Sequence, residues 1–274
     1  MKVDGRIAVL TGATGGIGAA VARELARRRA RLVLVARDEV RASCLAAELG
    51  TMGTAAHVLI GDMLDPALPG RLVEFAERRA GGIDLLINCA GRQSFGFFAD
   101  ESARAAEEVF QVNTIAPITL INAVLPGMLR RGHGQIVNVG SIFGSIGFPC
   151  FATYSASKFA LRGFSEALRR ELAGTGVVVT HVAPRFTRTP FNDGAVAAMA
   201  AALGMNQDEP EAVARALVDA IERDGQNRYL GWPEKLFVRV NALLPRIVDG
   251  ALMRQVEKMR PFAARDAETA DSLR

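Results

Sequence analysis

A tyrosine and a lysine stand four residues apart in the segment Tyr154-Ser-Ala-Ser-Lys158. On an α-helix two such side chains share one face, about 6 Å apart along the axis. A phenol with a pKa of about 10 exchanges protons poorly at neutral pH, and a neighbouring ammonium group favours the phenolate by charge attraction. The pair therefore has the composition of a proton-transfer site, although the same spacing also occurs by chance on many helices.

The charge of the lysine is not sufficient for that chemistry. Half ionisation of a tyrosine at neutral pH needs a shift of about three pKa units, which is ~4 kcal/mol. An exposed lysine contributes less than this amount. The pair therefore predicts a second positive charge in the site.

A glycine-rich turn, Thr11-Gly-Ala-Thr-Gly-Gly-Ile-Gly18, follows an apolar run and opens a helix that we expect over residues 17–28. Glycines let the backbone turn tightly and approach a pyrophosphate, whose charge is met by free amides at the helix N-terminus. The spacing is wider than the common dinucleotide fingerprint. We expect a phosphate site here rather than a turn with structural duties only. Its cofactor-binding residues are Gly12, Thr14, Gly15, Gly16, Ile17 and Gly18.

Short apolar, β-branched runs alternate with helical patterns along the chain. We expect strands at 7–10, 32–35, 57–60, 85–87, 135–139, 177–182 and 228–230. Continuously apolar strands separated by helices indicate a parallel sheet that is covered on both faces. The pattern predicts an α/β protein with a doubly wound, Rossmann-type fold and a seven-stranded parallel sheet.

The composition fits one soluble globular domain. The chain has 274 residues, of which 50% are hydrophobic and 23% charged, so a sizeable core is available. We expect a single domain over residues 1–260, with an amphipathic extension at 232–260 and a flexible tail at 261–274.

The net charge of +4 comes from interspersed charges and does not indicate a nucleic-acid partner. Scattered cysteines and histidines predict no disulfide and no metal site, and the absence of an apolar leader predicts a cytoplasmic protein.

Taken together, these motifs resemble the short-chain dehydrogenase/reductase family over residues 6 to about 232. The features that carry the resemblance are the glycine turn, Asn88-Cys-Ala-Gly91, Asn113, Ser141, Tyr154 and Lys158. The resemblance implies an oxidoreductase that interconverts a carbonyl and an alcohol with a nicotinamide cofactor. The oxidised nicotinamide would then supply the second positive charge.

The resemblance also implies a role for each of the four catalytic residues. Tyr154 passes the proton, while Lys158 lowers the pKa of that tyrosine and binds the nicotinamide ribose. Ser141 polarises the substrate oxygen, and Asn113 holds a water molecule that connects the lysine to solvent. Further cofactor-site residues are implied at Asp62, Met63, Asn88, Ala90, Gly91, Pro184, Thr187 and Thr189, of which Asn88, Ala90 and Gly91 are implied to steady the sheet near the cofactor.

The end of the second strand indicates which cofactor is used. Relatives that use NAD carry an acid where Ala36 stands, and such a carboxylate would repel a 2′-phosphate. Arg37 instead offers a planar guanidinium that suits phosphate. We therefore expect NADP(H) in preference to NAD(H). The alternative is a surface arginine that pairs with Asp38.

The expected substrate is hydrophobic, such as an acyl or other lipid-derived carbonyl compound. The predicted substrate pocket consists of Ser141, Phe143, Phe148, Cys150, Phe151, Tyr154 and Arg185. Arg185 stands where relatives have a glycine, so it contacts the cofactor, an anionic substrate group or only solvent. The segment 191–203 is either a mobile lid over the substrate or an ordinary amphipathic helix.

Two features concern partners. The extension at 232–260 is too interrupted by charges and prolines to span a bilayer, and its helical spacing fits either peripheral membrane contact or packing within the protein or a dimer. Helices near 104–129 and 154–172 resemble the family's dimer surface, so we expect a homodimer or homotetramer.

A catalytically silent nucleotide-sensing or scaffold protein is the alternative function. A sugar-nucleotide epimerase is less favoured, since the chain has little room for a separate substrate domain.

Overall fold

The computed structural model of the chain describes residues 1–223 and 226–271, with side chains through residue 263. Its sheet has seven parallel strands in the order β3-β2-β1-β4-β5-β6-β7. The strands are β1 (Ile7–Thr11), β2 (Arg31–Ala36), β3 (Ala56–Ile60), β4 (Leu85–Asn88), β5 (Gly134–Val139), β6 (Val177–Ala183) and β7 (Asn227–Tyr229). The predicted doubly wound, seven-stranded fold is confirmed.

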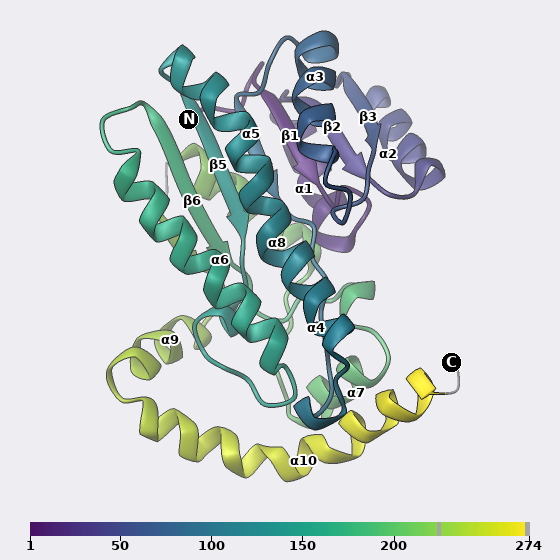
Figure 1. Ribbon diagram of the computed structural model, residues 1–274, viewed down its shortest axis with the longest axis vertical. Coiled ribbons are helices and arrows are strands. Elements are labelled where there is room, and N and C mark those ends of the chain that lie inside the picture. The colour runs from purple at the N-terminus through teal and green to yellow at the C-terminus, as the bar shows by residue number, and fades with distance from the viewer. Residues whose placement is uncertain (224–225, 272–274) are drawn as a thin grey trace.

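Helices cover both faces of the sheet, as Figure 1 shows. They are α1 (Gly16–Arg27), α2 (Glu39–Thr51), α3 (Leu68–Ala80), α4 (Ala103–Phe110), α5 (Ala116–Arg131), α6 (Ala152–Glu171), α7 (Ala195–Ala202), α8 (Pro210–Glu222), α9 (Glu234–Leu243) and α10 (Pro245–Asp271). Helices α1, α2 and α8 pack on one face, and α3, α5 and α6 pack on the other.

The central strands are mostly apolar on both sides because both faces of the sheet are buried. Along β1, Val9 belongs to the hydrophobic cluster of α3 and α5, and Leu10 belongs to that of α1 and α8. Strand β1 lies between β2 and β4, so the strand order reverses beside it. In doubly wound sheets, ligands bind at the carboxyl ends of the strands at this reversal point.

The expected continuous helix at 104–129 is divided. Helix α4 ends at Phe110, a π-helical turn spans Gln111–Ile115, and α5 begins at Ala116. By length and composition alone the run from 103 to 131 could cross a membrane. Its inner residues Leu120 and Val124 are buried against the sheet, as in the core helix of a globular domain.

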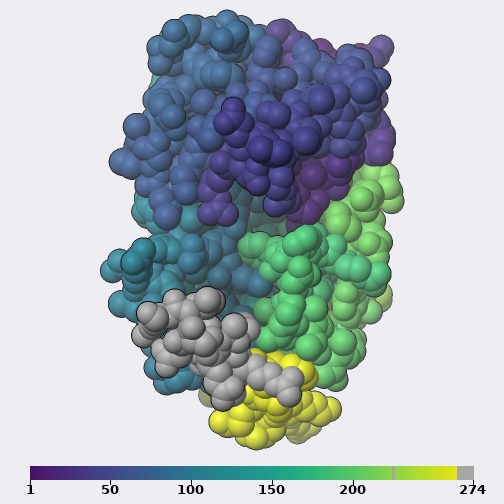
Figure 2. Space-filling model, turned by 90° about the vertical axis from the view of Figure 1, so that its right-hand side faces the viewer, coloured from purple at the N-terminus to yellow at the C-terminus, as the bar shows by residue number. Residues whose placement is uncertain are grey.

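The C-terminal extension forms two helices at one end of the molecule. Helices α9 and α10 meet at a bend, and α10 runs below α7 (Figures 1 and 2). We expected a flexible tail from residue 261, but α10 continues through Asp271. Met259 and Ala263 are buried in a hydrophobic cluster with Met199 of α7, which explains why the helix continues. Residues 272–274 lie outside the described part.

The glycine turn provides a test of the fold. A Cβ on Gly18 would lie 2.1 Å from the carbonyl oxygen of Gly12, a backbone atom that cannot move aside cheaply. We expect Gly18→Ala to lower the free energy of unfolding by about 1–3 kcal/mol, as overpacking does. Urea unfolding followed by circular dichroism measures this change.

Gly50→Ala is the matched control, because Gly50 lies in α2 with no atom within 4 Å of the added Cβ. This variant should unfold at the same urea concentration as the wild type or higher, with a gain of about 0.4–1 kcal/mol. Equal stability of the two variants would contradict the tight contact at Gly18.

Candidate active site

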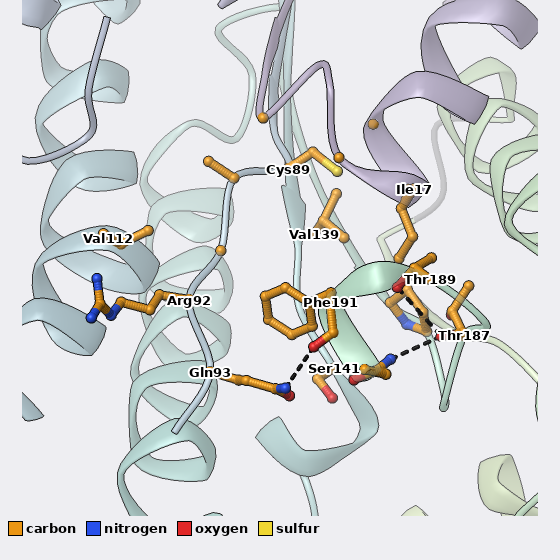
Figure 3. Close-up of a pocket in the computed structure, with 18 of the residues that line it drawn as sticks. Ile17, Cys89, Arg92, Gln93, Val112, Val139, Ser141, Thr187, Thr189 and Phe191 are labelled. Atoms are coloured by element: carbon orange, nitrogen blue, oxygen red, sulfur yellow. Dashed lines mark hydrogen bonds between the residues drawn. The ribbon is translucent and has the colours of Figure 1, made fainter. Parts of the chain in front are cut away.

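A cavity of about 840 Å³ lies at the carboxyl ends of the central strands. Its walls come from the glycine turn, the ends of β2, β4 and β5, the start of α6 and the loop after β6 (Figure 3). The residues predicted for the site that line it are Gly12, Thr14, Gly15, Gly16, Ile17, Gly18, Arg37, Asp62, Met63, Ala90, Gly91, Ser141, Phe143, Phe151, Tyr154, Lys158, Pro184, Arg185, Thr187 and Thr189.

Tyr154 and Lys158 lie one turn apart on α6, and both are buried. The Nζ atom of Lys158 donates a hydrogen bond to the carbonyl oxygen of Val139, at 3.0 Å, where β5 ends. The same Nζ lies 5.9 Å from the centre of the Tyr154 ring. The end of β5 therefore fixes the lysine, and α6 fixes the tyrosine relative to it.

Ser141 comes directly after β5 and caps a short 3-10 helix, Ile142–Gly144. Its Oγ accepts a hydrogen bond from the amide of Phe143 at 3.1 Å, and its hydroxyl group has a lowering effect on the pKa of Tyr154. The 3-10 helix packs tightly on α6, since a Cβ on Gly144 would lie 2.8 Å from the carbonyl oxygen of Lys158. This close approach brings Ser141 to the tyrosine.

Burial controls the protonation of the pair. Burial raises the pKa of Tyr154 to about 12, against the opposing effect of the Ser141 hydrogen bond. Burial also lowers the pKa of Lys158 to about 8. We expected the lysine together with a bound nicotinamide to bring the tyrosine pKa down; in the protein by itself, loss of hydration is the largest effect on the pKa of Tyr154. At neutral pH the phenol is protonated, and most of the lysine is charged.

Asn113 is fully buried and does not line the cavity, and the water-holding role expected for it stays a prediction. It lies in the π-helical turn, and its Nδ2 donates to the carbonyl oxygen of Arg92 at 2.7 Å and to Ser157 Oγ at 2.9 Å. Its Oδ1 accepts from the amide of Arg92 at 2.8 Å. Asn113 therefore holds the loop after β4 against α6 and acts as a positioning residue.

Two of the predicted pocket residues, Phe148 and Cys150, lie behind the cavity wall rather than in it. The ring of Phe148 stacks on that of Phe143 at 4.4 Å, and Phe143 lines the cavity. Cys150 is buried in the same cluster, with a positive φ of 63°. The chain turns at Cys150, so only the next residue, Phe151, reaches the wall.

Asn88 also lies outside the cavity, although we expected it to contact the cofactor. Its Nδ2 donates to Asn138 Oδ1 at 2.9 Å, and Asn138 Nδ2 donates to Ser165 Oγ at 2.9 Å. This buried chain of hydrogen bonds joins β4, β5 and α6. Asn88 therefore fixes the spacing of the elements that carry the site.

The charge of Arg185 is already paired with two carboxylates. Its Nε and Nη2 donate to both carboxylate oxygens of Asp208, at 3.0 and 2.8 Å, and its Nη1 donates to Glu234 at 2.9 Å. The side chain is 16% exposed, so the solvent alternative is also wrong. The guanidinium joins the loop after β6 to the segment before α8 and to the first residue of α9.

Arg41 is a cavity residue that the sequence did not reveal. It lies in the first turn of α2, and its Nη2 donates to the carbonyl oxygen of Thr14 at 2.8 Å. Arg37 and Arg41 line the same end of the cavity as the glycine turn. Asp38 caps α2 by accepting from the amide of Arg41, and the described residues include no ion pair between Asp38 and Arg37.

The segment after β6 covers the cavity. Phe191 and Val196 line it, and the Phe191 ring lies 6.3 Å from that of Tyr154. Gln93 donates to the carbonyl oxygen of Phe191, as Figure 3 shows. On α7, Val196 and Met199 are buried against α10. The segment 191–203 therefore includes a packed helix, and its first residues form part of the cavity wall.

The donors at the glycine turn fit a dinucleotide phosphate. Gly15 caps α1 with no side-chain hydrogen bond, and the first turn of α1 has no acidic residue, so its amides can meet an anion. A Cβ on Gly16 would lie 2.4 Å from Thr189 Cγ2, so a glycine is required where the two loops meet. The arginines at 37 and 41 add two positive charges at this end.

Comparison with known proteins agrees with this geometry. A model of the short chain dehydrogenase family matches residues 6–200. The chain is 32% identical over 254 residues to "Ketoacyl reductase HetN" of Nostoc sp., covering 90% of this chain and 88% of that protein.

Two solved structures are also similar. A short-chain dehydrogenase from Sphingobium yanoikuyae in complex with NADPH is 32% identical, with a TM-score of 0.74 over 92% of this chain and 95% of that one. A short chain dehydrogenase/reductase from Burkholderia phymatum in complex with NAD is 25% identical, with a TM-score of 0.83 over 95% and 97%. The resemblance found in the sequence is thus confirmed.

The buried lysine predicts a specific dependence of stability on pH. Its pKa is about 8 in the folded protein, below the ordinary value of 10.5, so between these values the folded state loses the proton first. Stability of the wild type should therefore rise with pH relative to Lys158→Met. Between about pH 7 and pH 9.5 this relative gain should be about 2 kcal/mol. Urea unfolding at both pH values measures it.

Lys235→Met is the control, since Lys235 is exposed. Its difference from the wild type should be the same at both pH values. A constant difference for Lys158→Met would instead mean that the ammonium group is hydrated in the folded protein.

Proposed function

Because this chain belongs to the short-chain dehydrogenase family and is an oxidoreductase, we propose that it uses NADP(H) to interconvert a carbonyl and an alcohol on a hydrophobic, acyl or lipid-derived substrate. The observation that carries the proposal is that Ser141, Tyr154 and the buried Lys158 line one cavity. The name of the Nostoc relative, a ketoacyl reductase, supports the acyl substrate.

In this proposal the protein supplies the proton and holds the oxygen of the substrate. A bound nicotinamide would supply or accept the hydride. The Tyr154 hydroxyl is protonated at neutral pH, which is the state that a proton donor to a carbonyl oxygen needs. Ser141 accepts from the Phe143 amide, so its own hydrogen is free to bond a substrate oxygen and stabilise developing charge.

Two arginines support NADP(H). Arg37 and Arg41 lie at the cavity end of β2 and α2, where the adenosine ribose would bind, and neither has an acidic side chain as an ion-pair partner among the described residues. Guanidinium groups bind phosphate with several hydrogen bonds at once. Ala36, at the end of β2, provides no carboxylate to repel a 2′-phosphate.

The substrate end of the cavity supports an apolar ligand. Its walls include Phe143, Phe151, Phe191, Val196 and Met205. The two nearby cations are already paired, Arg185 with Asp208 and Arg92 with Glu108 at 2.8 Å. Among the described residues, a substrate carboxylate would therefore find neither of these two arginines unpaired at this end.

A homodimer or homotetramer is part of the proposal. Ile115 and Leu129 at the two ends of α5, together with Phe159 on α6, are exposed apolar side chains on helices that resemble the dimer surface of the family. Burial of such residues between subunits is favourable. Light scattering of the purified protein measures the assembly.

Tyr154→Phe tests the proton donor. The variant keeps the ring and loses only the hydroxyl, so we expect the fold and NADPH binding to remain, while turnover falls by about 10²–10⁴-fold. NADPH consumption with a panel of ketones and 3-oxoacyl thioesters of graded chain length gives turnover, and fluorescence titration gives cofactor affinity.

Phe191→Tyr is the matched control, because it adds a hydroxyl to another ring of the same cavity and leaves Tyr154 in place. It should retain turnover. Wild-type protein that binds NADPH but reduces no member of the panel would favour the silent, nucleotide-sensing alternative. Near-normal turnover by Tyr154→Phe would exclude this tyrosine as the proton donor.

A double variant, Arg37→Ala with Arg41→Ala, tests the choice of cofactor. Loss of charge-assisted hydrogen bonds to a 2′-phosphate should raise KM for NADPH by about 10–100-fold and change KM for NADH little. Steady-state kinetics with both cofactors measures the ratio. An equal rise in KM for NADPH and for NADH would show that the two arginines do not bind the 2′-phosphate.

A further inference from the structure

An exposed apolar corner lies where α9 and α10 meet. Leu243 and Leu244 end α9, and Ile247 is in the first turn of α10; these side chains are 80%, 56% and 61% exposed. Phe237 and Met253, which are also exposed, lie on the flanking helices. Single exposed apolar residues are ordinary, but a group of this size marks an interaction surface. We call these five residues the apolar corner.

The apolar corner is not left over from packing of the two helices. The inner side of α9 is already buried through Val238, which packs on Ile142 and Ile146. Asn241 fixes the same side by donating to the carbonyl oxygen of Ser145 at 2.9 Å. Helix α10 is anchored separately through Met259. Val238, Asn241 and Met259 thus hold α9 and α10 in place, and the apolar corner is free for a partner.

Cations surround the corner. Lys235, Arg239, Arg246 and Arg254 are exposed, and none of the four forms an ion pair within the described part of the chain. Of the nearby acids, Glu234 pairs with Arg185 and Glu257 pairs with Arg260, while Asp249 is exposed and opposes one of the four cations. The surface around the corner therefore carries an excess of positive charge.

We propose that the apolar corner binds a membrane surface that contains anionic lipid, with Leu243, Leu244 and Ile247 inserted among the headgroups. Apolar side chains interspersed with arginine and lysine are the composition of helices that lie in a membrane interface. Each cation adds about 1 kcal/mol of attraction to an anionic surface. This surface is distinct from the cavity, so the proposal does not rest on the proposed enzymatic activity.

The charge and the shape favour a membrane over a second copy of the chain. Two corners that met face to face would bring their like-charged arginines together, which is unfavourable. An anionic lipid surface complements the same charges. In Figure 1 the bend between α9 and α10 projects at the edge of the molecule, a shape that can enter a headgroup layer.

The test is sedimentation of the full chain with vesicles. We expect binding to vesicles of phosphatidylcholine with phosphatidylglycerol, weaker binding to phosphatidylcholine alone, and loss of binding at high salt. The double variant Leu243→Ser with Ile247→Ser should lower the partition coefficient by at least about tenfold, because it removes inserted apolar area.

A matched control removes exposed apolar residues elsewhere. Val40 and Met52 at the two ends of α2 are 72% and 39% exposed, and Val40→Ser with Met52→Ser should bind vesicles like the wild type. In a Trp232→Phe background, Ile247→Trp places the single tryptophan at the corner. Its fluorescence should shift to the blue with vesicles and be quenched by brominated lipid.

Two results would overturn the proposal. One is equal sedimentation of the corner variant and the α2 variant. The other is that the wild-type protein does not bind anionic vesicles, while the variant changed at Leu243 and Ile247 dissociates into smaller species. That outcome would assign the corner to contact between subunits. The thermal midpoint of each variant confirms that the fold is intact.

Discussion

The hydroxyl of Thr11 joins the two loops on which the site depends. It accepts hydrogen bonds from the amides of Cys89 and Ala90, at 3.0 and 3.2 Å, and donates one to the carbonyl oxygen of Ile87, at 3.4 Å. The loops are so close that a Cβ on Gly12 would lie 2.7 Å from Ala90 Cα. This contact holds the ends of β1 and β4 together at the reversal of strand order. The glycine turn and the loop after β4 therefore line one cavity.

The chemistry of the site depends on how strongly it is buried. Nζ of Lys158 donates to one carbonyl oxygen, that of Val139, and Gly144 packs tightly against the backbone of the same lysine. Burial favours the neutral forms, so the tyrosine keeps its proton and the lysine has a lowered pKa. A site with this ground state is ready to donate a proton to a carbonyl oxygen.

Arg185 connects the cavity to the C-terminal part of the chain. It stands where the family has glycine, and it needs room that Gly231 provides, since a Cβ on Gly231 would lie 2.4 Å from Arg185 Cδ. The ion pairs of Arg185 with Asp208 and Glu234 hold the segment before α8 and the start of α9 to the loop after β6. The same arginine that closes the cavity thus also positions the helix that begins the apolar corner.

The sequence by itself determined the seven strands and the glycine turn, and it identified Ser141, Tyr154 and Lys158 as residues of the site. These features are local, because strand periodicity, glycine spacing and a four-residue step on a helix need no distant partner. Only the tertiary structure decided that Phe148 lies behind the wall, that Arg41 reaches the cavity and that Asn113 and Arg185 are fully engaged. It also decided the protonation of the pair. Such properties depend on burial and on partners that are distant in sequence, and the order of residues does not encode these contacts locally.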